Sequence, residues 1–232
     1  MRHRTAPARV FLCCAVVALT VLPGCAVSSY TTAHNLAAGK ANFWIAPQAM
    51  RVGVSANPTS MPFVELGTRY GITDKVEVGA RIGAGLQADV KISLRRPKVA
   101  YEGLTVSAAP GLGYIGNFSG TPTGADGDDI HFAGATLPVY LTWDFGEHLG
   151  VTVGPRTTWL MQYVETATAS TVYAVGVGTS LSLAWRITPT FMIVPEVSVV
   201  TTVFRAMTGA GSVFGTGQQA VLQAGIAFVM GG

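Results

Sequence analysis

The chain contains little charge and little cysteine. Only 12% of its 232 residues are Asp, Glu, Lys or Arg, and its three cysteines are Cys13, Cys14 and Cys25. No apolar run reaches the roughly 20 residues that a membrane-spanning helix needs. No stretch follows the 3.6-residue period of an amphipathic helix. These absences argue against a disulfide-rich scaffold and against a helical protein, whether in a membrane or in water.

The N-terminus has the composition of a secretory signal. Basic residues at Arg2, His3, Arg4 and Arg9 precede an apolar run from Val10 to Leu22, and a small residue follows before the expected cut. The sequence Leu22-Pro23-Gly24-Cys25 then resembles the lipobox of bacterial lipoproteins, although Pro23 departs from the usual residue there. The resemblance implies cleavage between Gly24 and Cys25, a diacylglycerol on the Cys25 thiol and acylation of the new amino terminus. The alternative is an ordinary secretory signal that happens to carry a cysteine.

Removing residues 1–24 changes what the composition implies. Of the 15 Lys and Arg residues, Arg2, Arg4 and Arg9 lie in the signal, so the mature chain has as many basic as acidic residues. The basic excess of the whole chain therefore gives no reason to expect nucleic acid as a partner. Cys25 is the only cysteine left, so no disulfide forms within one mature chain.

The mature chain shows mainly a period of two, which is typical of β-strands. The pattern predicts about ten strands, with eight as the alternative. We expect them at 42–54, 62–72, 75–82, 86–95, 104–115, 132–145, 149–162, 171–186, 190–203 and 219–230.

The two faces of these strands differ mainly in the size of their side chains. Over 86–95, for example, Leu86, Val90 and Ile92 alternate with Asp89 and Lys91. The second face is built largely from Gly, Ala and Ser with scattered charges, which suits a narrow lumen, while the aliphatic face suits lipid. Closure is then required, because lipid satisfies no open strand edge. We expect a charge network in the lumen, with a structural role, formed by Glu65, Arg69, Glu77, Arg81, Asp89, Lys91, Arg95, Arg156 and Glu196.

Connection lengths and aromatic residues support a transmembrane barrel. The links 73–74, 96–103, 146–148 and 187–189 fall at one end, and the mostly longer links 56–61, 116–131, 163–170 and 204–218 fall at the other. Trp and Tyr prefer the two membrane interfaces. We expect one aromatic belt from Tyr70, Trp143, Phe145, Trp185, Phe191 and Phe228, and a second from Tyr114, Trp159 and Tyr173.

Two stretches resemble small bacterial outer-membrane β-barrel proteins. They are the hairpin from Glu65 to Gly79, which contains Arg-Tyr-Gly-Ile-Thr-Asp-Lys-Val-Glu-Val-Gly, and the later Ala109-Pro110-Gly111-Leu112-Gly113-Tyr114. The resemblance implies fold and location more than activity. The C-terminus departs from it, because many such proteins end on an aromatic residue and this chain ends Phe228-Val229-Met230-Gly231-Gly232.

One cluster carries potential catalytic or metal-binding groups, at Asp126, Asp128, Asp129 and His131. It is either a calcium loop, an acid–base site at the barrel mouth or a solvated turn. It lacks the closing Glu and the ligand spacing of an EF-hand, so the solvated turn is favoured. The chain has no Walker A loop, no His-Glu-x-x-His and no Gly-x-Ser-x-Gly. We therefore expect no catalytic residue, metal or cofactor.

The sequence thus predicts a signal peptide at 1–24, a lipidated periplasmic tether at 25–41 and a closed antiparallel transmembrane β-barrel at 42–232. The expected function is a non-catalytic surface or structural protein, or a narrow channel. It would be anchored at the periplasmic leaflet of the outer membrane, with membrane lipids and the lipoprotein-processing and barrel-assembly machineries as partners. Two alternatives stay open: a periplasmic lipoprotein with a soluble barrel that binds an apolar ligand, and an outer-membrane enzyme that uses the acidic loop.

Overall fold

The described part of the computed structural model is built from strands. It covers residues 28–52, 59–99, 101–115, 129–165, 170–208 and 220–232. No helix in these ranges is long and apolar enough to cross a membrane. The strands are β1 (Ala41–Val52), β2 (Thr59–Thr73), β3 (Val76–Ile82), β4 (Leu86–Arg95), β5 (Glu102–Ala108), β6 (Gly111–Ile115), β7 (Asp129–Phe145), β8 (Leu149–Val153), β9 (Arg156–Glu165), β10 (Ser170–Thr188), β11 (Phe191–Thr208) and β12 (Ala220–Gly231).

These twelve segments form ten strands of the wall. Segments β5 and β6 follow one another between the same two neighbours, β4 and β7, and β8 and β9 do so between β7 and β10. Pro110 and Pro155 lie at the two interruptions, where the missing N–H breaks the ladder. Backbone bonds from Ala109 N to Pro138 O at 3.0 Å and from Val139 N to Pro155 O at 2.9 Å bridge the gaps. The predicted count of ten is confirmed.

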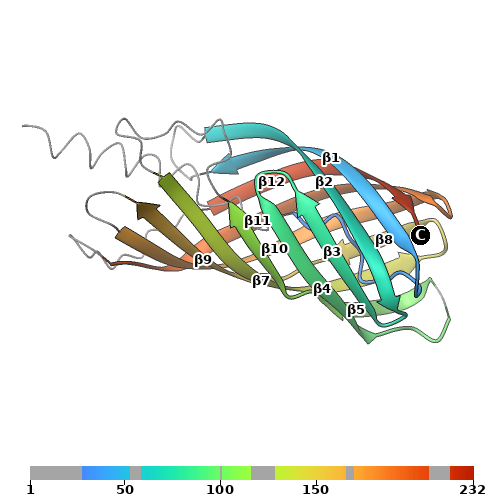
Figure 1. Cartoon of the computed structure of the whole chain (residues 1–232). Helices are drawn as coiled ribbons and strands as arrows, with labels where there is room; N and C mark the ends of the chain where they lie inside the picture. Colours follow the sequence, from blue (N-terminus) through green and yellow to red (C-terminus); the bar gives the residue numbers. More distant parts are fainter. Residues whose placement is uncertain (1–27, 53–58, 100, 116–128, 166–169, 209–219) are drawn as a thin grey trace, which may run out of the picture.

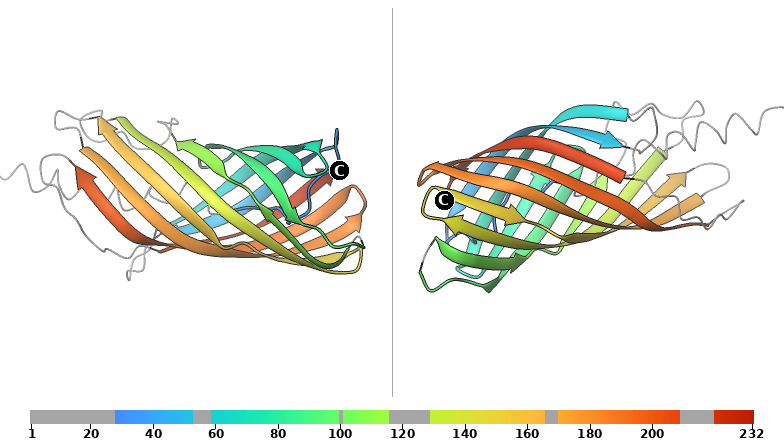
Figure 2. Two further views of the ribbon diagram at one scale, coloured as in Figure 1. Left: turned by 90° about the horizontal axis from the view of Figure 1, so that it is seen from below. Right: turned by 180° about the vertical axis from the view of Figure 1, so that it is seen from behind.

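The sheet closes into a barrel. Each strand is antiparallel to its neighbours, and β1 completes the ring by pairing with β12 on one side and β2 on the other. Figures 1 and 2 show the tilted strands wrapped around a single axis. Closure pairs the first described strand with the last, so the sheet has no free terminal strand, as the sequence pattern required.

The two ends of the barrel differ in their connections. We call the end with the links 74–75, 96–101, 146–148 and 189–190 the turn end. We call the opposite end the loop end, where the links 53–58, 83–85, 116–128, 166–169 and 209–219 join the strands. The C-terminus lies at the turn end (Figure 1). The links 116–128 and 209–219 at the loop end are longer than any link at the turn end, whereas 83–85 and 166–169 are short.

Between the two ends of the barrel, the charged side chains face inward and most of the large apolar side chains face outward. In β1, Trp44, Gln48 and Met50 are buried, while Phe43 and Ile45 are exposed. In β4, Lys91 is buried and Ile92 exposed. The predicted division of faces is therefore confirmed, and it is the reverse of the arrangement in a soluble protein.

The segment before β1 lies inside the barrel. Residues 28–33 are all buried, and the chain enters at the turn end, where Gly39 N donates to Gly71 O at 2.8 Å and Gly71 N to Lys40 O at 2.9 Å. We call residues 28–38 the plug. The structure here differs from the expected tether at 25–41. A barrel of about eight strands is filled by its own side chains, and the wider ten-stranded barrel accommodates an additional stretch of chain.

Candidate functional site

The lumen holds the plug mainly through charged side chains of the wall. Glu196 on β11 accepts three hydrogen bonds from it: Ser29 N at 2.8 Å, Ser29 Oγ at 2.7 Å and Tyr30 N at 2.8 Å. Arg156 on β9 donates to Ser180 Oγ at 2.6 Å and to Ser29 Oγ at 3.5 Å. The Glu196 carboxylate thus satisfies two successive backbone N–H groups and one hydroxyl group, which would otherwise be buried without a partner.

Glu65 on β2 organises the part of the lumen nearer the loop end. It accepts hydrogen bonds from Ser28 Oγ at 2.8 Å and from Trp44 Nε1 at 3.2 Å. Arg81 NH1 lies 3.9 Å from Glu65 Oε1 and donates to the carbonyl oxygen of Ser28. The first described residue of the plug is therefore held on both its hydroxyl and its carbonyl.

A second charge cluster spans β2, β3 and β4 nearer the turn end. Arg69 NH1 lies 3.1 Å from Glu77 Oε1 and 2.8 Å from Asp89 Oδ1. Lys91 Nζ pairs with Glu77 at 2.7 Å, and it also donates to the plug: to Thr31 Oγ1 at 3.1 Å, Thr32 O at 3.0 Å and His34 O at 2.6 Å. Glu77 in turn accepts from Leu36 N at 2.8 Å. Cations thus bind the plug's carbonyls and carboxylates bind its N–H groups.

A third group closes the turn end. His34 Nε2 lies 2.6 Å from Asp144 Oδ2, and Arg186 NH2 lies 2.9 Å from Asp144 Oδ1. The Arg186 guanidinium stacks over the ring of Tyr101 at 4.8 Å, and the rings of His34 and Tyr101 are 5.8 Å apart. A cavity of about 540 Å³ opens beside these residues and ends on the plug at Tyr30.

The structure places eight of the nine lumen residues named from the sequence on the inner face of the barrel. Seven are buried and Asp89 is half-buried, which gives four cations and four carboxylates inside. Balance matters here, because an unpaired charge in a low-dielectric interior costs several kcal/mol. Arg95 is the exception: it is exposed at the turn end, beyond a register shift between Ser93 and Arg95 that breaks the alternation.

Several functional positions were not predicted. The plug was missed because residues 28–36 show no periodic pattern, and with it His34, Asp144 and Arg186. Two inward-facing glycines were the only signal in the sequence that we can connect with the plug. An added Cβ at Gly71 would overlap the carbonyl of Ala37, and one at Gly225 would overlap the hydroxyl of Tyr30. Glycine occupies these two positions because the plug fills the space that a larger side chain would need.

Other predicted positions lie outside the described residues. This applies to Gly24 and Cys25 of the lipobox, and to Asp126 and Asp128 of the acidic cluster; the side chains of Asp129 and His131 are likewise not described. Within the described ranges, no group of three or more His, Cys, Asp or Glu residues is arranged to hold a metal.

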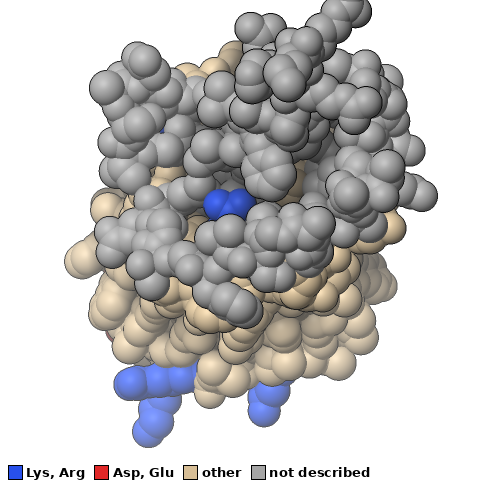
Figure 3. Space-filling model, turned by 90° about the vertical axis from the view of Figure 1, so that its left-hand side faces the viewer, with Lys and Arg blue, Asp and Glu red and all other residues tan. Residues whose placement is uncertain are grey.

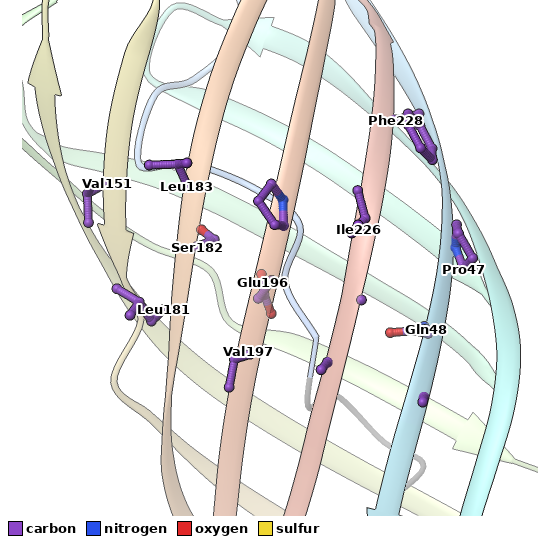
Figure 4. A pocket seen from close by; sticks show the side chains of 14 residues that line it. Pro47, Gln48, Val151, Leu181, Ser182, Leu183, Glu196, Val197, Ile226 and Phe228 are labelled. Atoms are coloured by element: carbon purple, nitrogen blue, oxygen red, sulfur yellow. The ribbon is translucent and has the colours of Figure 1, made fainter.

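The outer wall is apolar between its ends. Leu112 is 70% exposed, Phe145 66% and Leu181 57%, and the wall in Figure 3 is almost uncharged. A groove of about 810 Å³ lies across β8, β10, β11, β12 and β1. Figure 4 shows the side chains that line it, with the plug's ribbon behind the strands. The exposed charged side chains of the described residues lie only at the two ends: Arg51 at the loop end, and Lys40, Asp74, Lys75, Arg95, Arg96, Lys98, Glu102 and Glu147 at the turn end.

The comparisons with known proteins identify no family. No family model and no curated protein matches the chain. Among solved structures, Neisserial surface protein A is similar at a TM-score of 0.40 and 10% identity, covering 81% of this chain and 95% of that one. The Yersinia pestis attachment invasion locus protein Ail has a TM-score of 0.36 and 9% identity, covering 83% and 99%. OprG from Pseudomonas aeruginosa, an outer membrane protein, has a TM-score of 0.37 and 10% identity, covering 87% and 97%.

Similarity at this level carries no functional argument. The chain's own geometry defines its class: a closed ten-stranded antiparallel barrel with an apolar outer wall, a charge-balanced lumen and its own N-terminal segment inside.

Proposed function

We infer that this protein is a bacterial outer-membrane β-barrel, lipid-modified at Cys25, that acts as a non-catalytic surface protein with a closed lumen. The observation that carries the proposal is the outer wall: exposed large apolar side chains encircle the barrel, and charged ones lie only at its ends among the described residues. A soluble monomer rarely exposes an apolar patch beyond a few hundred Å². An apolar surface of this extent is stable when it contacts the hydrocarbon core of a membrane.

The aromatic residues support the same environment. Tyr70, Trp143 and Trp185 are exposed near the turn end, and Trp159 and Tyr173 nearer the loop end. Their polar edges and apolar rings suit the two membrane interfaces. Outer-membrane barrels have short turns in the periplasm and longer loops outside, so we assign the turn end to the periplasm and the loop end to the exterior.

The lumen favours a closed surface protein over a channel. The plug lies inside the wall and bonds to β2, β3, β4, β7 and β11 through the contacts described above. The charged clusters and the plug that occupy the lumen also disfavour the soluble alternative, because a barrel that binds an apolar ligand needs an open apolar interior. The side chains of the acidic cluster on which an enzyme would depend lie outside the described part of the chain.

The lipid is supported by the sequence alone. Leu22, Gly24 and Cys25 fit the lipobox, and the chain would then use the lipoprotein-processing machinery before the barrel-assembly machinery. The barrel wall makes the lipid a second attachment. Membrane lipids are the partner that the outer wall requires.

Fractionation of the full chain and of Cys25→Ser tests this proposal. Both proteins are expected in the outer-membrane fraction, both with a band that shifts on heating in denaturing gels, and only the first should carry labelled palmitate. Cys25→Ser recovered as a soluble periplasmic protein would refute the barrel. In planar bilayers the full chain is expected to give no steady conductance, and a steady open current would favour the channel instead.

A further inference from the structure

We propose that the mature N-terminus passes through the barrel and leaves at the loop end, so that the lipid on Cys25 lies in the outer leaflet. This inference rests on the proposed function for the membrane and for the lipid, but its route through the lumen comes from described residues. It reverses the expected anchoring at the periplasmic leaflet.

The direction of the plug is fixed at both of its ends. Lys40 bonds to Gly71 at the turn end, and Ser28 bonds to Glu65 and Arg81 on the other side of the lumen. A small cavity beside Ser28 is bounded by the β3–β4 turn, Gly83 to Gly85, which is a link of the loop end. The chain therefore runs from the loop end to the turn end as residue number increases, before it reverses into β1.

The position of Ser28 limits where Cys25 can be. Three residues span at most about 10 Å when fully extended. The turn end is reached only at Lys40, twelve residues away, along a path that the plug itself fills. A lipid attached to Cys25 therefore lies on the loop side of the plug whenever the plug is seated.

The β3–β4 turn beside Ser28 leaves part of the neighbouring strand β2 without a partner on that side. The last pair of β2 with β3 is Leu66 with Ile82, whereas β2 extends to Thr59 and so continues for seven residues without a β3 partner. At 3.3 Å per residue that is roughly 20 Å of strand. Figure 1 shows the β3–β4 turn stopping short of the neighbouring strand ends. The result is a notch in the rim beside Ser28.

This notch lies at the level of the apolar wall. Val64 is 51% exposed, Leu86 53% and Tyr114 46% on the strands that border it. A chain crossing the rim there meets hydrocarbon or its interface directly. An acyl group on Cys25 therefore has a short route into the outer leaflet.

The lining of the lumen changes from charged to apolar toward the loop end. Beyond the charged clusters, the wall toward the loop end is lined by an apolar group that includes Met50, Val200 and Val221, with Met61 and Phe63 packed against it. Met50 and Phe63 also border the cavity beside Ser28. An apolar lining suits Ala26, Val27 and a lipid-bearing residue better than the polar lining along residues 28–36 does.

Epitope accessibility on intact cells tests the route. The full chain receives one epitope between Ala26 and Val27 or, as a second variant, between Val27 and Ser28. Two controls carry the same epitope after Gly124, in a link of the loop end, or after Gly146, in a link of the turn end. Only variants that keep the heat-shifted band in the outer-membrane fraction are scored.

The proposal expects antibody to label the N-terminal and Gly124 epitopes on intact cells at similar levels. The Gly146 epitope should be labelled only after the outer membrane is permeabilised. N-terminal epitopes that need permeabilisation while the Gly124 epitope does not would overturn the route and leave the barrel standing. Labelling of the Gly146 epitope on intact cells would overturn the assigned orientation and with it the outer-leaflet lipid.

Discussion

The hydroxyl of Tyr30 lies directly over the backbone of Gly225 on β12, where a Cβ atom would overlap it. The same hydroxyl donates to Gln48 Oε1 at 2.7 Å. Plug and wall therefore depend on each other at this position. Residue 225 has only a hydrogen atom as its side chain, which leaves room for the Tyr30 side chain. A Cβ at Gly225 would also meet Gln48 and Pro47 on β1, so a substitution there disturbs the plug and the adjoining wall without changing a charge.

Gly225→Ala is expected to destabilise the folded barrel. Overpacking a well-packed interior costs about 1–3 kcal/mol, and the measurement is the temperature at which the heat-shifted band converts to the unfolded one. The change Tyr30→Phe removes the overlapping oxygen. The fall in melting temperature in Tyr30→Phe/Gly225→Ala should therefore be smaller than the sum of the falls in the two single variants. Ala224→Val, on the adjacent outward position, is the control and should melt near the wild-type temperature. An unaltered melting temperature for Gly225→Ala would contradict the seated plug.

Glu196→Gln is expected to loosen the plug. The carboxylate accepts three hydrogen bonds from Ser29 and Tyr30, and hydrogen bonds to a charged group contribute roughly 1.5–3 kcal/mol each. The variant should melt at a lower temperature and show intermittent conductance in planar bilayers, where the wild type stays closed. Glu147→Gln, at an exposed position of the turn end, serves as the matched control and should change neither property. Equal behaviour of the two variants would argue that the plug does not depend on Glu196.

Leu181→Arg is expected to impair assembly of the barrel in the membrane. Leu181 is 57% exposed on the outer wall, and an arginine near the bilayer centre costs about 2–4 kcal/mol. The amount of heat-shifted protein in the outer-membrane fraction should fall several-fold. Leu181→Ala should stay close to wild type, because it removes apolar surface without adding a charge. Normal levels of Leu181→Arg would indicate that this wall faces water.

Much of the wall could be predicted from the sequence because its pattern is local. Alternation along β4 separates Ile92 from Lys91 whatever the rest of the chain does, and the predicted strand ranges match the observed ones closely. Arg95 was misplaced because a bulge breaks that alternation, and no residue type marks the bulge in advance. Pro110 and Pro155 divide two predicted strands without moving them from the wall.

The plug was not predictable in the same way. Its residues have no periodicity, and its position is set by partners far away in sequence, such as Glu196 for Ser29 and Lys91 for Thr32. The inward charges were identified from the strand pattern, but their pairing with one another was expected to fill the lumen. The structure instead divides their hydrogen bonds between one another and a segment that had been expected outside the barrel.

The most direct test of a barrel that encloses its own N-terminal segment is a disulfide between the two. The hydroxyl oxygens of Ser29 and Ser180 lie 3.4 Å apart although 151 residues separate them. In Ser29→Cys/Ser180→Cys, isolated from the outer-membrane fraction, we predict a nearly complete disulfide, seen as altered migration of the heated protein without reductant. Ser29→Cys/Thr179→Cys places the second thiol on the outer face of the wall and should not cross-link. Correct membrane insertion of Ser29→Cys/Ser180→Cys with both thiols free would contradict the account.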